Sequence, residues 1–222
     1  MIVRDLTKTY DGRKVLDVKH FEFEKGRIYA VVGANGSGKS TFAKVLAGVI
    51  SSDEANCILR DKTCVVRYSP QKGYAFRMST LKNVTMAGKG KRDREKAKEL
   101  LKSLDMEHLM KTPAHKLSGG ETAKMALARV MMEKCDYLIL DEPCAAMDVQ
   151  STLKTEELVK AYCEKCGCAV IIITHSLKQA ERISDRVLYF EEGILTESGA
   201  SAEILHNPKS EKTRAFLDFY TI

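Results

Sequence analysis

One stretch, Gly33 to Thr41, constrains this chain more than any other. Its letters, GANGSGKST, fit the pattern G-x-x-x-x-G-K-[ST] in full. The apolar run Ile28–Val32 before it predicts a buried strand, and apolar residues at helical spacing from Phe42 to Ile50 predict an amphipathic helix after it. A strand, a tight glycine-rich reversal and a helix are the context in which this pattern binds phosphate.

The residue types in this loop suit a polyphosphate. Glycine permits positive φ angles and lets backbone N–H groups approach an anion at the positive end of the helix dipole. Lys39 is expected to reach the β- and γ-phosphates, and the Ser40 hydroxyl is expected to bind Mg²⁺. The alternative, a glycine-rich turn with an unrelated lysine, is disfavoured because the full spacing and both flanks are present. The expected nucleotide contacts are Val15, Gly33, Asn35, Gly36, Ser37, Gly38, Lys39, Ser40 and Thr41.

Composition describes an ordinary globular chain. With 222 residues, 44% hydrophobic and 30% charged, we expect one α/β domain with an inserted subdomain rather than two independent domains. The longest apolar runs are strand-sized and no signal peptide opens the chain, so the sequence predicts neither a membrane span nor export. Seven cysteines, an odd number, favour reduced thiols in the cytoplasm over a disulfide framework. The net charge of +6 would suit anionic lipid or nucleotide but is too small to indicate a nucleic-acid partner.

The residues before the phosphate loop predict an antiparallel sheet. Asp11-Gly12 is a hairpin signal between two runs of roughly alternating apolar residues. Tyr10 ends the first run, where an exposed aromatic side chain could stack on a base or simply cover the edge of a sheet. After the loop's helix, residues 51–62 are turn-like, and Thr63–Tyr68 predicts a strand that leads to Gln71.

From 72 to 116 the composition shifts to helix formers and charge, which predicts a helical subdomain. This subdomain would be inserted between residues 1–71 and 117–222. Those two segments together would form the ATP-binding core with the antiparallel β-subdomain. Between Lys89 and Lys102 there are seven basic residues and three acidic ones. A solvated helix face or a membrane-facing patch would account for that excess.

A second glycine-containing helix start lies in the second half of the chain. The letters LSGGE at 117–121 precede apolar residues at helical spacing from Ala123 to Met131. Serine and two glycines at a helix start expose several backbone N–H groups, which predicts a second anion-binding terminus. Its expected contacts are Ser118, Gly119, Gly120 and Glu121.

Polar residues also follow two buried runs. Asp141 and Glu142 come after Tyr137–Leu140, and two carboxylates there are costly unless they hold a cation or a proton. A helix-capping acidic pair is the alternative. His175 comes after Ala169–Ile173 and is either a functional histidine or an ordinary surface one. Strands that alternate with helices predict a mostly parallel sheet with functional residues at the carboxyl ends of its strands.

Cys163, Cys166 and Cys168 are the one group that could suggest a metal site. A closed site needs four ligands, and no second pair lies nearby in the sequence. We therefore expect these thiols to be buried or idle.

Together the motifs stand in the order and spacing of the ATP-binding cassette (ABC) transporter ATPases, which this chain resembles over nearly its whole length. The resemblance implies an α/β fold of the P-loop NTPase class, with a mostly parallel core sheet, an N-terminal antiparallel β-subdomain and an inserted α-helical subdomain. The serine-glycine-glycine helix start just before the Asp-Glu strand is its most specific part, since many ATPases share the phosphate loop. The motifs that carry it are 33–41, Gln71, 117–121, 140–143, Met147-Asp148 and His175.

The resemblance also implies a role for each motif residue. Those roles are Tyr10 for adenine stacking, Gln71 for linking Mg²⁺ to the membrane partner, Asp141 for orienting Mg²⁺, Glu142 for polarising water, Asp148 for a dimer contact and His175 as the switch histidine.

Three features depart from the family pattern. Glu121 stands where glutamine is usual, 144–147 replaces the usual Thr-Ser-Ala-Leu, and 48–71 is shorter than is common. The first two bear on rate and dimer affinity rather than on activity. The third trims the antiparallel sheet.

The function that the resemblance implies is that of a cytoplasmic subunit that binds and hydrolyses MgATP between two head-to-tail copies. It would drive a separate membrane permease, with an extracytoplasmic solute-binding protein in the complex. The tail from 197 onward resembles those of bacterial and archaeal importers for small polar solutes, amino acids or oxyanions such as tungstate. The alternative is a regulatory ABC ATPase that controls a membrane or cell-wall machine without moving a solute. Nucleic-acid-associated ABC ATPases usually need two cassettes or a long coiled-coil insertion, and the sequence has neither.

Overall fold

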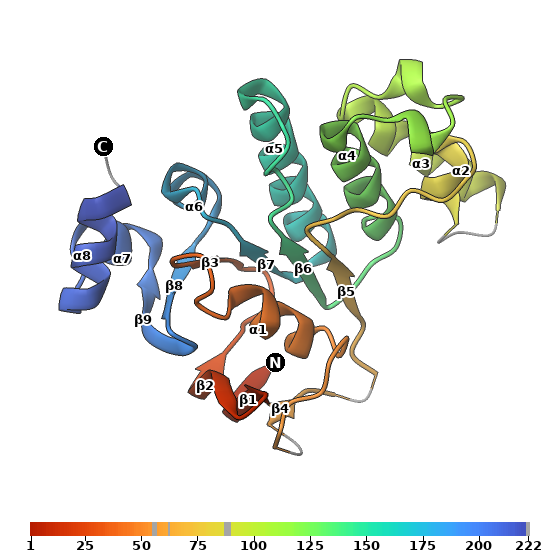
Figure 1. Ribbon diagram of the computed structural model, residues 1–222. Coiled ribbons are helices and arrows are strands. Elements are labelled where there is room, and N and C mark those ends of the chain that lie inside the picture. The colour runs from red at the N-terminus through yellow and green to blue at the C-terminus, as the bar shows by residue number, and fades with distance from the viewer. Residues whose placement is uncertain (55–56, 62, 87–89, 221–222) are drawn as a thin grey trace.

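A single twisted sheet organises the fold (Figure 1). The computed structural model describes residues 1–54, 57–61, 63–86 and 90–220. In this part of the chain the strand order is β4-β1-β2-β9-β8-β3-β7-β6-β5. The strands are β1 (Ile2–Tyr10), β2 (Arg13–Glu22), β3 (Ile28–Val32), β4 (Ile58–Leu59), β5 (Val66–Ser69), β6 (Tyr137–Asp141), β7 (Ala169–Ile173), β8 (Arg186–Glu191) and β9 (Ile194–Ala200).

The sheet has a parallel part and an antiparallel part, as the sequence predicts. Strands β8, β3, β7, β6 and β5 run parallel to their neighbours in that order. The pairs β1–β2, β1–β4 and β8–β9 are antiparallel, and one parallel pairing, Asp17 with Ile194, joins β2 to β9. The three parallel strands at the centre of the sheet, β3, β6 and β7, are wholly buried because helices or other strands cover both of their faces.

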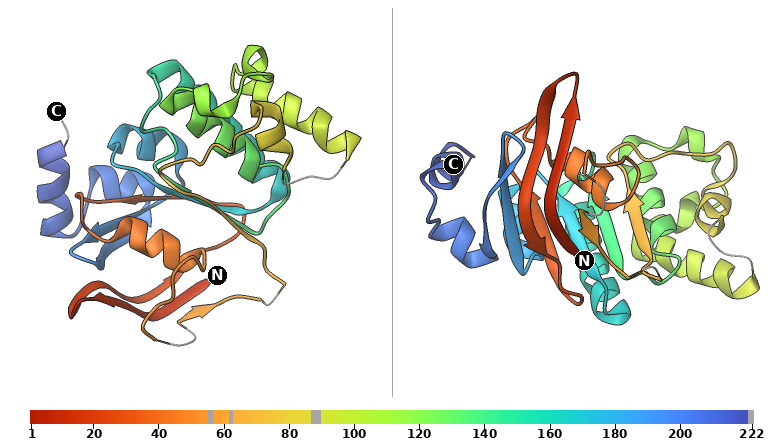
Figure 2. Two further views of the ribbon diagram at one scale, coloured as in Figure 1. Left: turned by 45° about the vertical axis from the view of Figure 1, so that its right-hand side comes forward. Right: turned by 90° about the horizontal axis from the view of Figure 1, so that it is seen from below.

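Helices lie on both sides of the parallel strands (Figures 1 and 2). The first helix, α1, packs between these strands and the antiparallel ribbon, and alternate residues of β7 face either this core or the one beneath α5. The helices are α1 (Lys39–Leu46), α2 (Thr80–Thr85), α3 (Lys91–Ser103), η1 (Glu107–Leu109), η2 (Ala114–Lys116), α4 (Gly119–Val130), α5 (Val149–Cys166), α6 (Leu177–Ile183), α7 (Ser201–His206) and α8 (Glu211–Tyr220).

Within the described part of 72–116 lie the helices α2, α3, η1 and η2, which form a layer at one end of the sheet together with α4 (Figure 2). Leu101 of α3 and Met125 of α4 are fully buried in the core that also contains Leu138 of β6. The layer therefore shares a hydrophobic core with the strand that carries the two carboxylates. The division into 1–71, 72–116 and 117–222 stays a prediction.

Two sequence predictions near the phosphate loop are wrong in detail. The first helix ends at Leu46, so Val49 and Ile50 lie outside it, because Gly48 adopts φ +72 and reverses the chain. Val49 is 57% exposed rather than part of an apolar helix face. The turn-like segment 51–62 contains the short strand β4, which pairing with β1 creates despite its weak local signal.

The next strand begins later than the sequence predicts. The segment before it turns, because Asp61 accepts hydrogen bonds from the backbone N–H and the hydroxyl of Thr63 through Oδ1, at 3.1 and 3.0 Å. Strand β5 therefore covers Val66–Ser69 instead of Thr63–Tyr68. Gln71 still follows it directly.

Candidate nucleotide site

The phosphate loop joins β3 to α1 and leaves the start of α1 open. Gly36 and Gly38 adopt φ +80 and +95, which only glycine takes without strain. Gly38 is the N-cap of α1, and no side chain caps the helix. The first N–H groups of α1 therefore have no intrahelical acceptor and face the position expected for an anion.

Lys39 is buried within its own loop. Its ammonium group donates to the carbonyls of Gly33 and Ala34, both at 2.7 Å, and approaches the Ser37 hydroxyl at 3.3 Å. Burial lowers the pKa of Lys39, whereas the carboxylates of Glu142 and Asp141 oppose that shift. Loop carbonyls thus hold the cation where a phosphate oxygen would replace them.

A hydroxyl and a carboxylate meet at the carboxyl end of β6. The Ser40 hydroxyl donates to Asp141 Oδ1 at 3.0 Å, and the Tyr68 hydroxyl donates to Oδ2 at 3.3 Å. Burial of Asp141 raises the pKa of its carboxyl, and the two hydroxyl bonds partly offset that rise. These oxygen donors fit Mg²⁺, which binds proteins through one or two carboxylates and hydroxyls. Sequence reasoning missed Tyr68, although it lies three residues before Gln71 in the strand next to β6.

Glu142, Gln71 and His175 also meet here, from three different segments. Glu142 Oε2 accepts a hydrogen bond from Gln71 Nε2 at 2.9 Å and lies 3.5 Å from His175 Nδ1. Glu142 has φ +47, a strained value for a non-glycine residue, while its N–H donates to Ile173 O at 2.9 Å. Strain of this kind is concentrated at functional sites because the surrounding structure must maintain it. The arrangement places a base beside the expected γ-phosphate position.

At the second helix start, the capping hydrogen bonds run between residues of the same helix end. The Ser118 N–H donates to Glu121 Oε2 at 2.7 Å, and the Glu121 N–H donates to the Ser118 hydroxyl at 3.3 Å, which forms a capping box. Asp148 likewise caps α5 by accepting from the Ser151 N–H at 2.8 Å. The hydrogen bonds described for Ser118 and Asp148 run to their own helices and not to the phosphate loop.

The glycines of the second helix start face the segment after β6. A Cβ at Gly120 would lie 2.7 Å from Ala146 O, whereas one at Gly119 would meet Ala146 Cβ at an ordinary 3.6 Å. Gly120 is thus required by this close packing. The capping box explains how Glu121 is accommodated at a position where the family pattern has glutamine.

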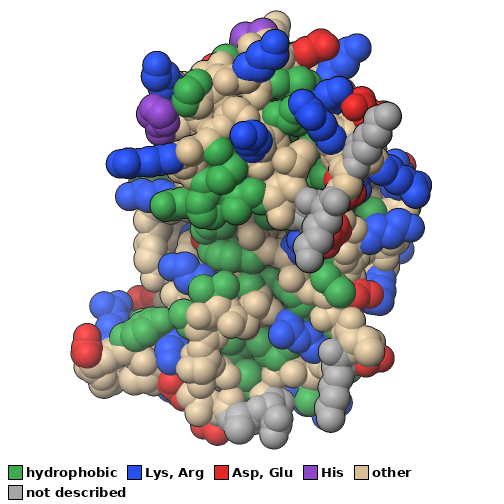
Figure 3. Space-filling view, turned by 90° about the vertical axis from the view of Figure 1, so that its right-hand side faces the viewer, with side chains coloured by type: hydrophobic (Ala, Val, Ile, Leu, Met, Phe, Trp, Pro, Cys, Tyr) green, Lys and Arg blue, Asp and Glu red, His purple; other side chains and the backbone are tan. Residues whose placement is uncertain are grey.

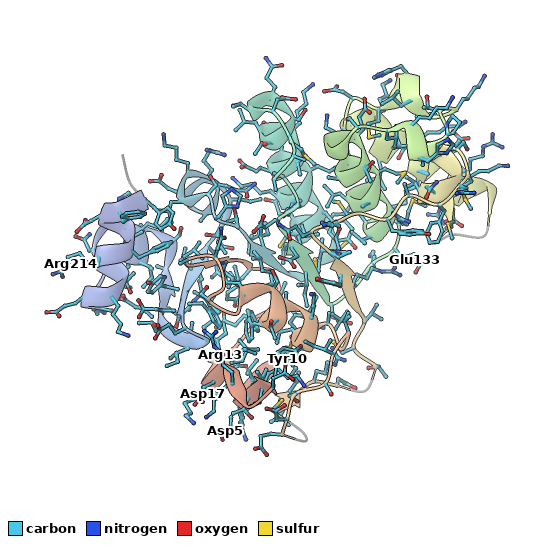
Figure 4. All side chains as sticks on the ribbon, in the orientation of Figure 1. Asp5, Tyr10, Arg13, Asp17, Glu133 and Arg214 are labelled. Carbon is cyan, nitrogen blue, oxygen red and sulfur yellow. The ribbon has the colours of Figure 1, made fainter. Side chains whose placement is uncertain are left out.

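Tyr10 lies at the end of β1 opposite Arg13, below α1 (Figure 4). Its side chain is 45% exposed, and Lys8 Nζ lies 5.3 Å from the ring centroid. The ring is thus available for stacking and already has a cation nearby.

The turn between β8 and β9 supports the phosphate loop, which sequence reasoning did not detect. The Gly193 N–H donates to Ser37 O at 3.0 Å. A Cβ at Gly193 would lie 2.4 Å from Val15 O, and one at Gly38 would lie 2.7 Å from the same oxygen. Val15 therefore borders the loop through its backbone.

Two cavities flank the site. One of about 420 Å³ is bounded by Glu142, His175 and the start of α6. Another of about 680 Å³ lies between residues 34–37 of the loop and α8, whose Lys212, Phe219 and Tyr220 line it. The sequence did not indicate that α8 would reach the loop.

The family model described as ABC transporter matches residues 16–145, which is more than half of the chain. This chain belongs to the ABC transporter family. It is the ATP-binding subunit of such a transporter and an ATPase, as the sequence predicts. The roles of the individual site residues stay predictions.

Named relatives agree with that assignment. The chain is 35% identical over 210 residues to the tungstate uptake system ATP-binding protein TupC of Peptoclostridium acidaminophilum, covering 88% of this chain and 96% of that protein. It is 31% identical to the zinc import ATP-binding protein ZnuC of Vibrio vulnificus strain YJ016, covering 93% and 78%. A solved dimeric ATP-binding cassette bound to ADP and phosphate shares the fold, with a TM-score of 0.80, 23% identity and coverage of 90% and 99%.

The sequence predicts no membrane-spanning helix. None of the helices within residues 1–54, 57–61, 63–86 and 90–220 is both long and apolar enough to cross a bilayer. The solved cassette bound to ADP and phosphate is dimeric, and the tungstate relative is the ATP-binding protein of an uptake system.

Proposed function

We propose that this cassette powers import of a small polar solute as an ATP-dependent, head-to-tail homodimer on a membrane permease. One observation carries the proposal. Lys39, Asp141 and Glu142 gather at one site, whereas the hydrogen bonds that the described residues make with the second helix start, at Ser118, run within its own helix. A second copy turned by a two-fold axis would supply that helix start to each nucleotide.

Each gathered residue has a task in phosphoryl transfer. Lys39 would bind the β- and γ-phosphates, with its ammonium released from the loop carbonyls. Ser40 and Asp141 would hold Mg²⁺, which supplies charge neutralisation at the phosphates, and Gln71 would complete its surroundings. Glu142 would accept the proton of the attacking water, and His175 would donate to the γ-phosphate.

The helical layer would dock the permease. Figure 3 views the molecule from the side of this layer and shows apolar side chains among Lys and Arg side chains. Tyr74 is 66% exposed and Met86 50% exposed on the segment after Gln71, and exposed apolar side chains with polar surroundings are typical of protein interfaces. The Arg129 guanidinium lies 5.4 Å from the Phe76 ring centroid and ties this segment to α4. Docking would hold the cassette on the inner face of the membrane.

The solute class rests on relatives, because the solute never reaches this subunit. The tungstate relative supports an oxyanion, whereas the zinc relative supports a metal cation. Both are importers, which supports import over a regulatory role. A solute-binding protein in the complex would give the solute specificity.

Hydrogen exchange tests the docking surface. The subunit assembled with its permease in nanodiscs is compared with the free subunit. We expect slower exchange of backbone amides between residues 71 and 116 in the assembled transporter. Exchange in β1 and β2 should be unchanged. Unchanged exchange throughout 71–116 would contradict docking there. Stimulation of ATPase activity in proteoliposomes by tungstate with its binding protein, and not by zinc, would identify the solute class.

A further inference from the structure

Positive charge is concentrated in the segment that forms most of the helical layer. Residues 72–116 include twelve Lys and Arg residues and five Asp and Glu residues, which gives a net charge of +7. The rest of the chain carries a net charge of −1. Figure 3 looks onto this layer and shows many Lys and Arg side chains on it. The phosphate loop with Lys39 lies outside this segment, so nucleotide binding does not account for the charge.

Helix α3 presents part of this charge as a row of three side chains, Arg94, Lys98 and Lys102. Because they are spaced by four residues, they lie along one side of the helix over about 12 Å. Arg94 and Lys102 are exposed, and Lys98 is partly exposed. Another side of α3 is apolar, since Ala97 and Leu101 are fully buried in the core shared with α2 and α4. The basic row therefore lies on the solvent side of an amphipathic helix.

The acidic residues of α3 do not cancel this row. Asp93 accepts a hydrogen bond from the Gly90 N–H at 2.9 Å and so caps the start of the helix. Glu95 pairs with Lys98 at 2.8 Å, but both side chains are open to solvent, where such a pair contributes little. Seven basic and three acidic residues lie between Lys89 and Lys102, so the helix keeps a net positive charge.

The composition of this segment favours a lipid surface over a protein or a nucleic acid. Protein interfaces are enriched in aromatic residues and depleted in Lys and Glu, and single-stranded nucleic acids stack on aromatic side chains. The sequence has no Phe, Tyr or Trp between Phe76 and Tyr137. A cluster of about four to eight Lys and Arg residues on an amphipathic helix is instead typical of binding to anionic lipid headgroups.

We propose that the row of Arg94, Lys98 and Lys102 binds anionic phospholipid headgroups of the membrane beside the docked permease. This rests on the permease docking proposed above, which uses the exposed side chains of Tyr74 and Met86. Helix α3 packs against α2, and Met86 directly follows α2. A membrane protein bound there would bring α3 toward the bilayer. Attraction between the row and the lipid phosphates would then add to the attachment that the permease provides.

The test is co-sedimentation of the full chain with vesicles that contain no permease. One set contains phosphatidylcholine alone, and in the other about one third is phosphatidylglycerol. We expect binding to the anionic vesicles to be about tenfold or more stronger, and most of that difference should disappear between about 0.05 M and about 0.5 M salt. Equal binding to the two sets would overturn the proposal. It would leave the permease docking untouched, because these vesicles hold no permease.

Matched variants separate the row from the net charge of the protein. The row variant should bind anionic vesicles about tenfold or more weakly, whereas the control should lose less than about twofold. Equal losses would show that only net charge matters, which would refute a site on α3. The row variant is Arg94→Gln with Lys98→Gln and Lys102→Gln, and the control, at three exposed residues elsewhere, is Lys19→Gln with Lys134→Gln and Lys165→Gln.

Glu99→Gln tests the opposite sign. Glu99 is exposed on α3, so removing its charge should tighten binding to anionic vesicles by about threefold and leave neutral vesicles unaffected. Unchanged or weaker binding would contradict the proposal. If urea unfolding shows that the row variant does not fold, Glu99→Gln and the salt dependence of the unchanged chain decide. A folded row variant that binds vesicles normally but loses stimulation by the permease would assign the row to the permease, and the lipid proposal would be wrong.

Discussion

Gln71 Nε2 donates a 2.9 Å hydrogen bond to Glu142 Oε2 and so links the start of the helical layer to the carboxylate that follows β6. The two residues are 71 positions apart in the sequence. They meet because Gln71 follows β5 and Glu142 follows β6, and these two parallel strands are neighbours in the sheet. A movement of the layer that displaces Gln71 would therefore change the surroundings of the base. This contact would give a permease docked on the layer, as proposed above, a direct physical route to hydrolysis.

Gln71→Ala should uncouple the permease from hydrolysis. The bond to a charged group is worth about 1.5–3 kcal/mol, so the loss of stimulated ATPase activity in the assembled transporter should be about tenfold or more. Binding of Mg²⁺-free ATP by the free subunit should change less than about twofold, because Lys39 and the loop are untouched. Lys19→Ala, at an exposed residue of β2 outside the proposed docking surface, is the control and should retain stimulation.

Tyr10→Ala should weaken ATP binding by about 1–3 kcal/mol, the usual cost of removing an aromatic platform from a stacked base. Tripolyphosphate should bind equally well to both proteins, since it has no base. Calorimetric titration with each ligand measures the difference, and Tyr10→Phe should bind ATP normally. Equal losses for ATP and tripolyphosphate would show that Tyr10 acts through the fold.

Glu142→Gln should trap a nucleotide-bound dimer. The substitution keeps the side chain's size but removes its basicity, so ATP should bind and the pair should close while proton abstraction fails. Light scattering after gel filtration should show a shift from monomer to dimer on addition of MgATP.

Adding Ser118→Arg to that variant should abolish the shift through steric clash and charge. Because Ser118 caps α4, its loss also costs about 1 kcal/mol of stability. Ser118→Ala, which loses the cap without the clash, is therefore the matched control for folding. A double mutant that still dimerises would mean that Ser118 does not complete the partner's site.

Mg²⁺-dependent ATP binding should weaken on acidification through Asp141. A proton and Mg²⁺ compete for the carboxylate, and burial raises its pKa above the ordinary 3.8. At any acidic pH more Asp141 is therefore protonated than an ordinary aspartate would be, so the loss should begin at a higher pH.

Tyr68→Phe should move that loss to a still higher pH, because the Tyr68 hydrogen bond lowers the Asp141 pKa. Titrations with a fluorescent nucleotide, with and without Mg²⁺ at each pH, measure the pH at which Mg²⁺-dependent binding is lost. Circular dichroism confirms that the chain stays folded. In Asp141→Asn, which has no carboxylate to protonate, acidification should not produce this loss of Mg²⁺-dependent binding. An unchanged profile in Tyr68→Phe would remove Tyr68 from the site.

Gly193→Ala should destabilise the chain more than Gly12→Ala. Both glycines have positive φ, +85 and +77, so each alanine costs about 1–3 kcal/mol in backbone strain. Only at Gly193 would the new Cβ also meet backbone, 2.4 Å from Val15 O, whereas Gly12 has open space around it. Urea unfolding should therefore show a clearly larger fall for Gly193→Ala. Similar falls would mean that the β8–β9 turn can shift away from the phosphate loop.

Local sequence determined the elements whose cause is itself local. The strand Ile28–Val32, the loop that follows it and the start of the helix at Lys39 depend on an apolar run and on glycines that permit positive φ. The capping box at Ser118 likewise involves residues three positions apart. Because each of these causes lies within a few neighbouring residues, the amino-acid sequence alone is enough to indicate the motifs.

Tertiary structure alone decided the features that depend on distant neighbours. Strand β4 exists because it pairs with β1. Tyr68 reaches Asp141 only because β5 and β6 are adjacent and in register, and Gly193 supports the loop from a turn far along the chain. Such contacts join residues with no shared periodicity, so the physical cause, packing between remote segments, leaves no pattern in the sequence itself.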